Sequence, residues 1–226
     1  MIKLQFKQLL SALIAACVMM TATVTAAEIE APMDMLKRTS DDVIKVLNEK
    51  REAIDADPNI VYQIVDNYIL PHLDDVTLAK LALGKGWKKA DNEQKIEFVD
   101  QFRTLLVRTY SKSLQEFSDQ TINFFEPKMK AGATKVTVKS EVLQSGGPSI
   151  PVAYRLRLKG DEWKVYDIKI DGVSLVTNYR GTFKQEMRKG GMKAVLKMLQ
   201  KKNAKVAEKK SDAPESTNND AGEQNS

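Results

Sequence analysis

The sequence predicts an α+β protein with N-terminal helices, a curved four-stranded antiparallel sheet and C-terminal helices that close it. Three observations predict this class. From Pro32 to Phe117 apolar residues recur every three or four positions, the spacing of helices with one buried face. From Ile122 to Ile170 they recur mainly every second position, as in strands with one buried face. After Ser174 the helical spacing returns.

Four helices are expected before the sheet, and each begins at residues that suit a first turn. Proline is accepted there because its fixed φ fits the helix, and an aspartate can accept hydrogen bonds from the free backbone N–H groups. Pro71 ends the second helix. The starts are Pro32, Asp57-Pro58, Asp74-Asp75 and Asp91-Asn92; the third helix ends near Leu83-Gly84 and the fourth, the longest, near Phe117.

Four strands follow, joined as a meander. The third carries Tyr154 and Leu156 on one face, and Lys159-Gly160-Asp161 forms a tight hairpin to the fourth strand, Trp163 to Ile170. Within that strand the apolar residues change face halfway. One extra residue would restore a common face, so we expect a bulge near Asp167. The earlier strands contain Ile122 and Phe124, and Val136, Val138 and Val142; Gly146-Gly147-Pro148 is a turn.

Two closing helices are expected after the sheet. One begins at about Ser174, and the other runs from Met192 to about Gln200, because Gly190-Gly191 interrupts the pattern. From Ala204 onward large apolar side chains are nearly absent. Such a segment cannot bury enough surface to offset its ordering entropy, so residues 204–226 are expected to be a disordered, dispensable tail.

The first 27 residues have the layout of a cleaved signal peptide. Lys3 and Lys7 precede an apolar run too short to span a bilayer, and small residues follow at Ala26-Ala27. A lipobox reading, in which Cys17 is lipidated, is the alternative; Val18-Met19-Met20 argues against it because the apolar run continues past the cysteine. Residues 28–203 then form one exported domain, expected in the periplasm.

Composition argues against several function classes. After residue 27 the chain has 33 basic and 30 acidic residues, a net charge of +3, which is weak for a nucleic-acid-binding protein. That part has no cysteine and one histidine, His72, so thiol catalysis and zinc–thiolate sites are excluded. We find no nucleophile elbow, phosphate-binding loop or metal-ligand spacing. We therefore expect no catalytic residues, no metal and no cofactor.

Several ordered segments resemble one known family. The sharpest is Gly172-Val173-Ser174-Leu175-Val176-Thr177-Asn178-Tyr179-Arg180, followed by Phe183 and Gly190-Gly191. The others are Leu70-Pro71-His72, Leu83-Gly84-Lys85-Gly86-Trp87, the helix from Phe98 to Thr109-Tyr110, and Trp163-Lys164-Val165-Tyr166-Asp167. Together, from about Pro32 to Leu199, they resemble the MlaC, or toluene-tolerance, family of periplasmic phospholipid-binding proteins.

The resemblance implies a soluble, non-enzymatic periplasmic carrier. It would shuttle phospholipid between the outer and inner membranes and so maintain outer-membrane lipid asymmetry. Its implied partners are an outer-membrane lipoprotein complex and an inner-membrane MCE-domain ring coupled to an ATPase. Phospholipid would be its cargo, with no cofactor and no nucleic acid, and the protein would be monomeric. Two alternatives stay open: an enzyme of NTF2-like appearance with a polar pocket, and an envelope adaptor that binds no lipid.

The apolar stripes exceed what one sheet face can cover, so the helices and sheet are expected to enclose an apolar pocket. A filled core is the alternative. Arg180 is expected to meet the lipid phosphate or an acidic partner, and Gly172-Val173-Ser174 to be a structural turn. The expected lipid-binding residues are Ile64, Val65, Ile69, Phe102, Leu105, Leu106, Tyr110, Leu114, Tyr154, Val173, Leu175, Val176, Tyr179 and Phe183.

Overall fold

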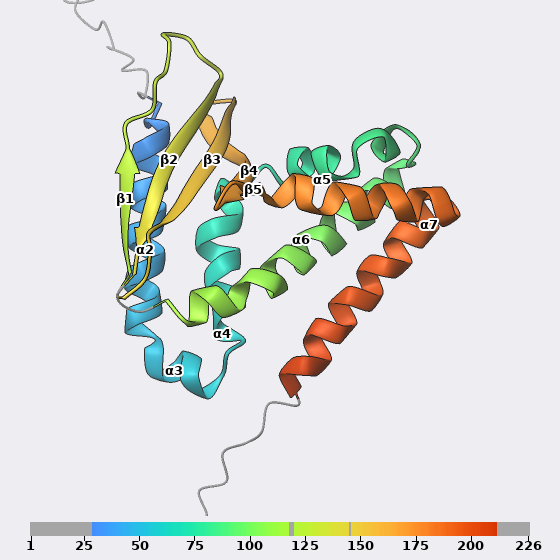
Figure 1. Ribbon diagram of the computed structural model, residues 1–226, viewed down its shortest axis with the longest axis horizontal. Helices are drawn as coiled ribbons and strands as arrows, with labels where there is room; N and C mark the ends of the chain where they lie inside the picture. The colour runs from blue at the N-terminus through green and yellow to red at the C-terminus, as the bar shows by residue number, and fades with distance from the viewer. Residues whose placement is uncertain (1–28, 118–119, 145, 212–226) are drawn as a thin grey trace, which may run out of the picture.

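The computed structural model describes residues 29–117, 120–144 and 146–211. The expected signal peptide, including Cys17, lies outside these residues, as does the end of the expected tail from 212 onward. The sheet forms one end of the molecule with helix α2 lying along it, and helices α6 and α7 extend away from it (Figure 1). The α+β class predicted from the sequence is confirmed.

The N-terminal helices begin close to the predicted starts. Asp91 caps α6 through a hydrogen bond of 2.8 Å from the Gln94 N–H, and Asp74 caps α5 through one of 3.2 Å from the Thr77 N–H. Asp57 does not cap its helix but accepts from the nearby Asn59 N–H. The elements are α2 (Pro32–Glu49), α3 (Arg51–Ala56), α4 (Ile60–Ile64), the π-helical η1 (Val65–Ile69), the 3₁₀ turn η2 (Leu70–His72), α5 (Asp75–Leu83), the 3₁₀ turn η3 (Gly84–Lys88) and α6 (Asn92–Gln115).

The sheet is antiparallel throughout and has five strands in chain order, one more than predicted. Asp171 and Gly172 have positive φ angles of 49° and 77°, which turn the chain back so that Val173 pairs with Ile170. A strand of two residues is too short to be recognised from the alternation of apolar and polar residues. The strands are β1 (Thr121–Phe125), β2 (Lys135–Leu143), β3 (Ile150–Lys159), β4 (Glu162–Ile170) and β5 (Val173–Ser174).

The predicted bulge in β4 is confirmed. Arg155 pairs with Asp167 while the next residue, Leu156, pairs with Val165, so Tyr166 is the extra residue. The bulge lets both halves of β4 turn their apolar side chains to the same face. That inner face packs against α2, and the cluster between them includes Met35, Leu36, Val136, Val138, Leu156, Trp163 and Val165.

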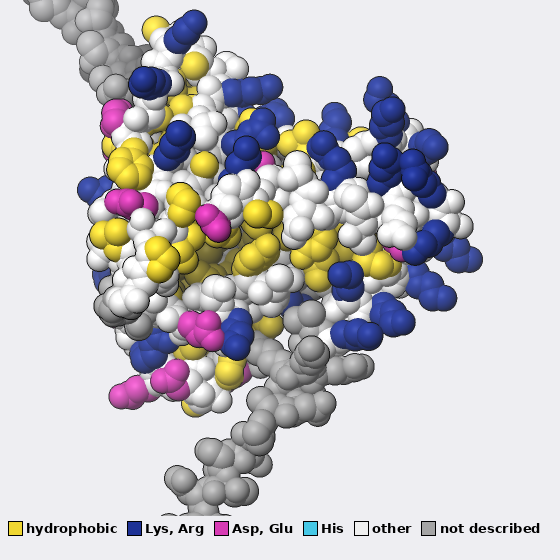
Figure 2. Space-filling model, in the orientation of Figure 1, with side chains coloured by type: hydrophobic (Ala, Val, Ile, Leu, Met, Phe, Trp, Pro, Cys, Tyr) yellow, Lys and Arg dark blue, Asp and Glu magenta, His cyan; other side chains and the backbone are white. Residues whose placement is uncertain are grey.

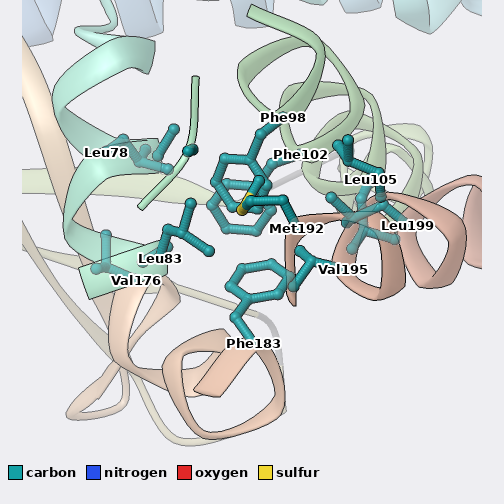
Figure 3. Close-up of a cluster of buried hydrophobic side chains, with 14 residues drawn as sticks. Leu78, Leu83, Phe98, Phe102, Leu105, Val176, Phe183, Met192, Val195 and Leu199 are labelled. Carbon is teal, nitrogen blue, oxygen red and sulfur yellow. The ribbon is translucent and has the colours of Figure 1, made fainter. Parts of the chain in front are cut away.

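A second core joins α5, α6 and α7 (Leu175–Ser211) and is filled with side chains (Figure 3). The Phe183 ring meets the rings of Phe98 and Phe102 edge-on, with centroids 5.1 Å and 5.2 Å apart. Edge-to-face contact is a favoured geometry for aromatic pairs. The long apolar face of α6 is therefore covered by α7 over most of its length.

Helix α7 bends where the sequence places two glycines. Gly191 has a φ of 63° and breaks the helical geometry between the two arms. The second arm continues past Gln200 to Ser211, so residues 204–211, for which the sequence predicted no structure, are helical. Buried Asn203 anchors this arm. Its side-chain Nδ2 donates to the backbone carbonyl of Gln101 at 3.0 Å, and its backbone carbonyl accepts a hydrogen bond from Arg108.

Candidate functional site

An apolar cavity of about 290 Å³ lies between the inner face of the sheet and the N-terminal helices. Helix α2 forms one wall, η1 and η2 form another, and the end of α6 closes the space against β1, β3 and β4. Most of the lining is aliphatic or aromatic. The lining residues are Leu36, Thr39, Ser40, Val43, Ile44, Leu47, Ile69, His72, Leu73, Leu114, Phe117, Ile122, Val152, Tyr154, Val165, Ile168 and Ile170.

Three of the residues predicted to bind lipid line this cavity: Ile69, Leu114 and Tyr154. Leu114 reaches it because it lies on the last turn of α6, beyond the part that α7 covers. Arg51 of α3 holds this end of the helix, donating to the Gln115 carbonyl at 2.6 Å and to the carbonyl of Phe117. The end of α6 is thereby fastened beside the cavity.

Most of the other predicted residues do not line this cavity in the structure. The physical reason is that α7 packs on the same stripe of α6 that was expected to face the pocket. Phe102, Leu105, Val176 and Phe183 are buried in the α5–α6–α7 core, with Leu106 and Tyr179 packed against it. Ile64 and Val65 are buried in a third cluster with Val43, Val46, Leu47, Ile54 and Val61.

Leu175 is buried at the start of α7, whereas Tyr110 of α6 is half-buried. Burial, with a smaller contribution from nearby Tyr179, raises the pKa of Tyr110. Neither residue lines the cavity. The pair Tyr110 and Tyr179 instead marks the surface between α6 and α7.

Val173 lies outside the cavity at its edge. Its side chain is 57% exposed, and its strand partner Ile170, which lines the cavity, is 36% exposed. Exposed aliphatic side chains beside an apolar cavity are suited to an entrance. Figure 2 shows a hollow lined by hydrophobic side chains between the sheet and helices α6 and α7. We call Ile170 and Val173 the apolar rim.

Helix α2 supplies six lining residues that the sequence analysis missed. Their positions follow successive steps of three and one, which is one face of an α-helix. The apolar spacing of Leu36, Val43 and Leu47 predicts a buried helix face, but it does not show that this face borders a cavity, and Thr39 and Ser40 are polar. The six are Leu36, Thr39, Ser40, Val43, Ile44 and Leu47.

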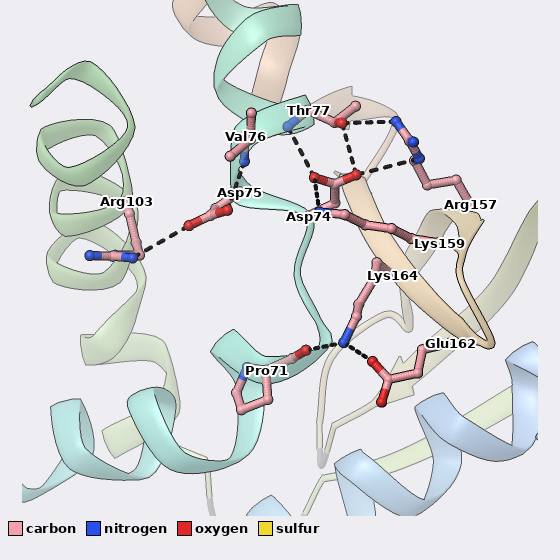
Figure 4. A network of polar contacts seen from close by, with 10 residues as sticks. All are labelled: Pro71, Asp74, Asp75, Val76, Thr77, Arg103, Arg157, Lys159, Glu162 and Lys164. Atoms are coloured by element: carbon pink, nitrogen blue, oxygen red, sulfur yellow. Dashed lines mark hydrogen bonds and ion pairs between the residues drawn. The ribbon is translucent and has the colours of Figure 1, made fainter. Parts of the chain in front are cut away.

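The η2 wall is fixed to the sheet by polar contacts (Figure 4). The Asp74 N–H donates to the Val165 carbonyl at 2.8 Å, which sets Leu73 beside β4. The buried Asp74 carboxylate lies 3.4 Å from Arg157 and 3.7 Å from Lys159 of β3. Helix α5 and the cavity wall before it are therefore held to the strands as one unit.

His72 gives this wall its one ionisable imidazole. Burial lowers the pKa of His72, and the positive charges of Arg38 and Lys164 lower it further, against smaller opposing effects of Glu30 and Glu162. Lys164 is held near the wall because its ammonium donates to the Pro71 carbonyl at 2.7 Å. The surroundings of His72 therefore favour its neutral form.

Two hydroxyl groups interrupt the apolar inner face of the sheet. Burial raises the pKa of Tyr154, and nearby Ser140 opposes part of that rise. Ser140 is buried, yet its Oγ has no hydrogen bond of good geometry to any described residue. Ser140 and Tyr154 therefore give the sheet side of the site a polar position among apolar side chains.

Arg180 lies away from the cavity lining. Its Nε and Nη2 both donate to the Leu81 carbonyl, at 3.0 Å and 2.6 Å, and so join α7 to α5. Ser174 Oγ accepts from the Thr177 N–H at 3.1 Å, and Gly172 has a φ of 77°, as expected for a turn with a helix cap.

Two further properties concern the part of the chain that the structure describes. Within it, no helix has both the length and the apolar character needed to cross a bilayer. It also contains no group of three or more histidine, cysteine or acidic side chains placed to hold a metal ion.

Comparison with known proteins gives a consistent result. The family model described as MlaC protein matches residues 37–201. The chain is 26% identical over 163 residues to the toluene tolerance protein ttg2D of Pseudomonas putida, covering 72% of this chain and 75% of that protein. It is 25% identical over 181 residues to the intermembrane phospholipid transport system binding protein MlaC of Haemophilus influenzae, covering 79% and 85%.

A solved structure is also similar. It is the phospholipid-binding protein from Ralstonia solanacearum, in complex with a phospholipid. The TM-score is 0.74 and the sequence identity 30%, and the match covers 80% of this chain and 99% of the other.

Proposed function

The chain belongs to the MlaC family, and from that premise we propose that it is a periplasmic phospholipid carrier. The observation that carries the proposal is the apolar cavity between α2 and the sheet, with an apolar rim beside it. A relative of 30% identity and the same fold was solved with a phospholipid bound. The aliphatic and aromatic lining would surround acyl chains with apolar groups, as the interior of a bilayer does.

The energetics favour an enclosed site. Each buried CH₂ group contributes about 0.8 kcal/mol, so a lipid with two chains needs on the order of 20 kcal/mol of apolar burial to leave a membrane. A surface groove would leave part of each chain in water. At about 290 Å³ the cavity is near the lower end of the usual range for ligand pockets, about 300 to 1,000 Å³. A whole phospholipid therefore requires the rim and the neighbouring helices to move apart.

The rim suits the passage of a lipid. Ile170 lines the cavity and is also partly exposed at the protein surface. An acyl chain can therefore pass from the cavity to the surface without crossing a polar barrier. The charged headgroup remains at the mouth, because burying a charge without a partner is costly.

The cellular role follows from the family. We propose that the chain is exported by its N-terminal signal and works as a monomer. It exchanges phospholipid with an outer-membrane lipoprotein complex and an inner-membrane MCE-domain ring. In this way it helps maintain the lipid asymmetry of the outer membrane. Because such a cavity holds acyl chains tightly, release requires a partner that opens the rim.

Organic extraction of the purified protein, followed by mass spectrometry, tests the proposal. A carrier retains phospholipid at a fixed stoichiometry through purification. Protein without bound lipid that also fails to take up phospholipid from vesicles would overturn the proposal. Turnover of an added lipid ester would favour the enzyme alternative, and binding of envelope proteins without lipid would favour the adaptor.

A further inference from the structure

Basic side chains gather at the end of the molecule formed by the bend in α7, far from the sheet (Figures 1 and 2). Residues 181–205 contain eight lysines and arginines and one acidic residue, Glu186. The chain after residue 27 has a net charge of only +3. These residues of α7 therefore carry a net charge of +7 (eight basic minus one acidic), which the total composition conceals.

Turn η3 adds lysines to the same end. Gly86 lies against α7, since a Cβ atom at this position would come within 3.2 Å of Met187. This contact places the lysines of η3 beside those of α7. We define the basic end by six exposed residues: Lys85, Lys88, Lys89, Lys184, Arg188 and Lys193.

Three of the nearby acidic groups are already engaged. Glu186 pairs with Lys189 at 2.7 Å, Asp91 caps α6, and Glu97 accepts from Gln200 at 2.9 Å; the remaining acidic side chain in the first turn of α6, Glu93, is exposed and adds one negative charge there. None of the six residues of the basic end forms an ion pair with another described residue. Their charge is therefore available to a partner.

An apolar groove of about 650 Å³ adjoins the basic end. Trp87 of η3 lies in it, and the Lys95 ammonium is 5.9 Å from the centre of the Trp87 ring. Two aliphatic side chains of the groove face solvent: Ile96 is 72% exposed and Val76 is 46% exposed.

We propose that the basic end and the Trp87 groove dock the protein on a membrane surface that contains anionic phospholipid. Lysines attract the negative surface of such a membrane, while tryptophan and exposed aliphatic side chains favour the region of the lipid headgroups. The cations are mostly lysines on long flexible stems, spread over two elements, which suits a mobile lipid surface better than a fixed set of carboxylates.

This surface lies at the opposite end of the molecule from the sheet that forms the cavity (Figure 1). Docking through it leaves Ile170 and Val173 free to meet a partner that exchanges lipid. The inference goes beyond the proposed function, because it concerns the membrane surface on which the protein docks rather than the ligand that it carries.

Sedimentation with vesicles tests the inference. The full chain is mixed with vesicles of phosphatidylcholine alone, or of phosphatidylcholine with phosphatidylglycerol, at low and high salt. We expect binding to the anionic vesicles that weakens with salt, and little binding to the neutral ones. The triple variant Lys85→Glu, Lys88→Glu, Arg188→Glu should bind at least about tenfold more weakly, because each cation near the surface contributes to the attraction.

A matched control reverses three exposed lysines of the sheet: Lys135→Glu, Lys139→Glu, Lys169→Glu. It changes the net charge equally and should keep most of the binding. The single variant Ile96→Ser tests the groove without changing charge, and should weaken binding several-fold at high salt. Equal losses in the two triple variants would overturn the inference, as would equal binding to both kinds of vesicle or no binding at all.

The two experiments can refute the two proposals independently of each other. Extraction of the same proteins measures bound phospholipid, which the basic-end variants should retain because they lie outside the cavity. Wild-type protein without phospholipid would overturn the proposed function and leave the sedimentation result unaffected.

Discussion

The Ser174 hydroxyl donates a hydrogen bond of 2.8 Å to the buried Asp167 carboxylate, and so ties the start of α7 to the bulge in β4. The same oxygen accepts from the Thr177 N–H. Arg155 lies 3.5 Å from the carboxylate on its other side. The Ser174 side chain thus joins β4, the turn at Gly172 and helix α7, which covers α6.

Replacing Ser174 with alanine should therefore cost more than a helix cap alone. We expect the free energy of unfolding to fall by about 2 to 3 kcal/mol, because the cap and a bond to a buried carboxylate are lost together. Urea unfolding measures the change. Ser113→Ala, an exposed position in α6, is the control and should change stability by less than about 0.5 kcal/mol. Equal stability of the two variants would contradict the role of the contact.

A carboxylate placed in the cavity should exclude lipid. Ile44→Glu and Leu114→Glu put a charge among apolar side chains, where acyl chains would have to pack against it. Met129→Glu is the control, because that aliphatic side chain is 47% exposed and does not line the cavity. Phospholipid extracted per protein should drop strongly in the first two variants and remain near normal in the third. Normal phospholipid content in the first two variants would contradict the assignment of the cavity as the binding site.

Two substitutions at Arg180 separate docking from packing. Arg180→Lys keeps the charge but cannot make both bonds to the Leu81 carbonyl, so it should destabilise the fold by about 1 kcal/mol. If the charge guides a partner, lipid transfer to an acceptor should stay normal in Arg180→Lys and slow in Arg180→Glu. Equal stability of Arg180→Lys and wild type would show that the bonds to Leu81 do not hold α7.

The effect of C-terminal truncation on stability should depend on whether Asn203 is retained. Ending it after Lys202 removes buried Asn203 and its bonds to Gln101 and Arg108, so we expect a loss of about 1 to 2 kcal/mol. The sequence by itself predicted no loss from this truncation. Ending the chain after Ser211 keeps Asn203 and serves as the control. Thermal unfolding of both proteins decides the matter, and identical midpoints would contradict the anchoring role.

Acid should weaken the fold through His72. Its pKa is lowered in the folded state, so the unfolded chain binds the proton more readily. This contribution to stability is fully present above the unfolded pKa of about 6.5 and is lost as the pH falls through 6.5 toward the folded value. His72→Gln should reduce the difference between urea midpoints at about pH 7.5 and about pH 5.5. Because the chain has one histidine, an unchanged difference would assign the effect to carboxylates.

Local patterns in the sequence determined the class of the fold and the places where elements begin. Capping by Asp74 and Asp91 depends on residues a few positions away, so it can be read along the chain. The bulge at Tyr166 could be predicted because alternation of apolar residues fails there within one strand. The ordered motifs were specific enough to predict the family that the comparisons confirm.

Only the tertiary structure decided which apolar faces meet each other and which border a cavity. Periodicity shows that the stripe containing Phe102 and Leu114 is buried, but burial against α7 and exposure to a cavity require the same apolar residues. Thr39 and Ser40 line the cavity although their polarity hides them in the pattern. The basic end likewise depends on η3 packing beside Met187, a contact between segments about a hundred residues apart in the chain. Such placements follow from the packing of whole elements, which no short stretch of sequence contains.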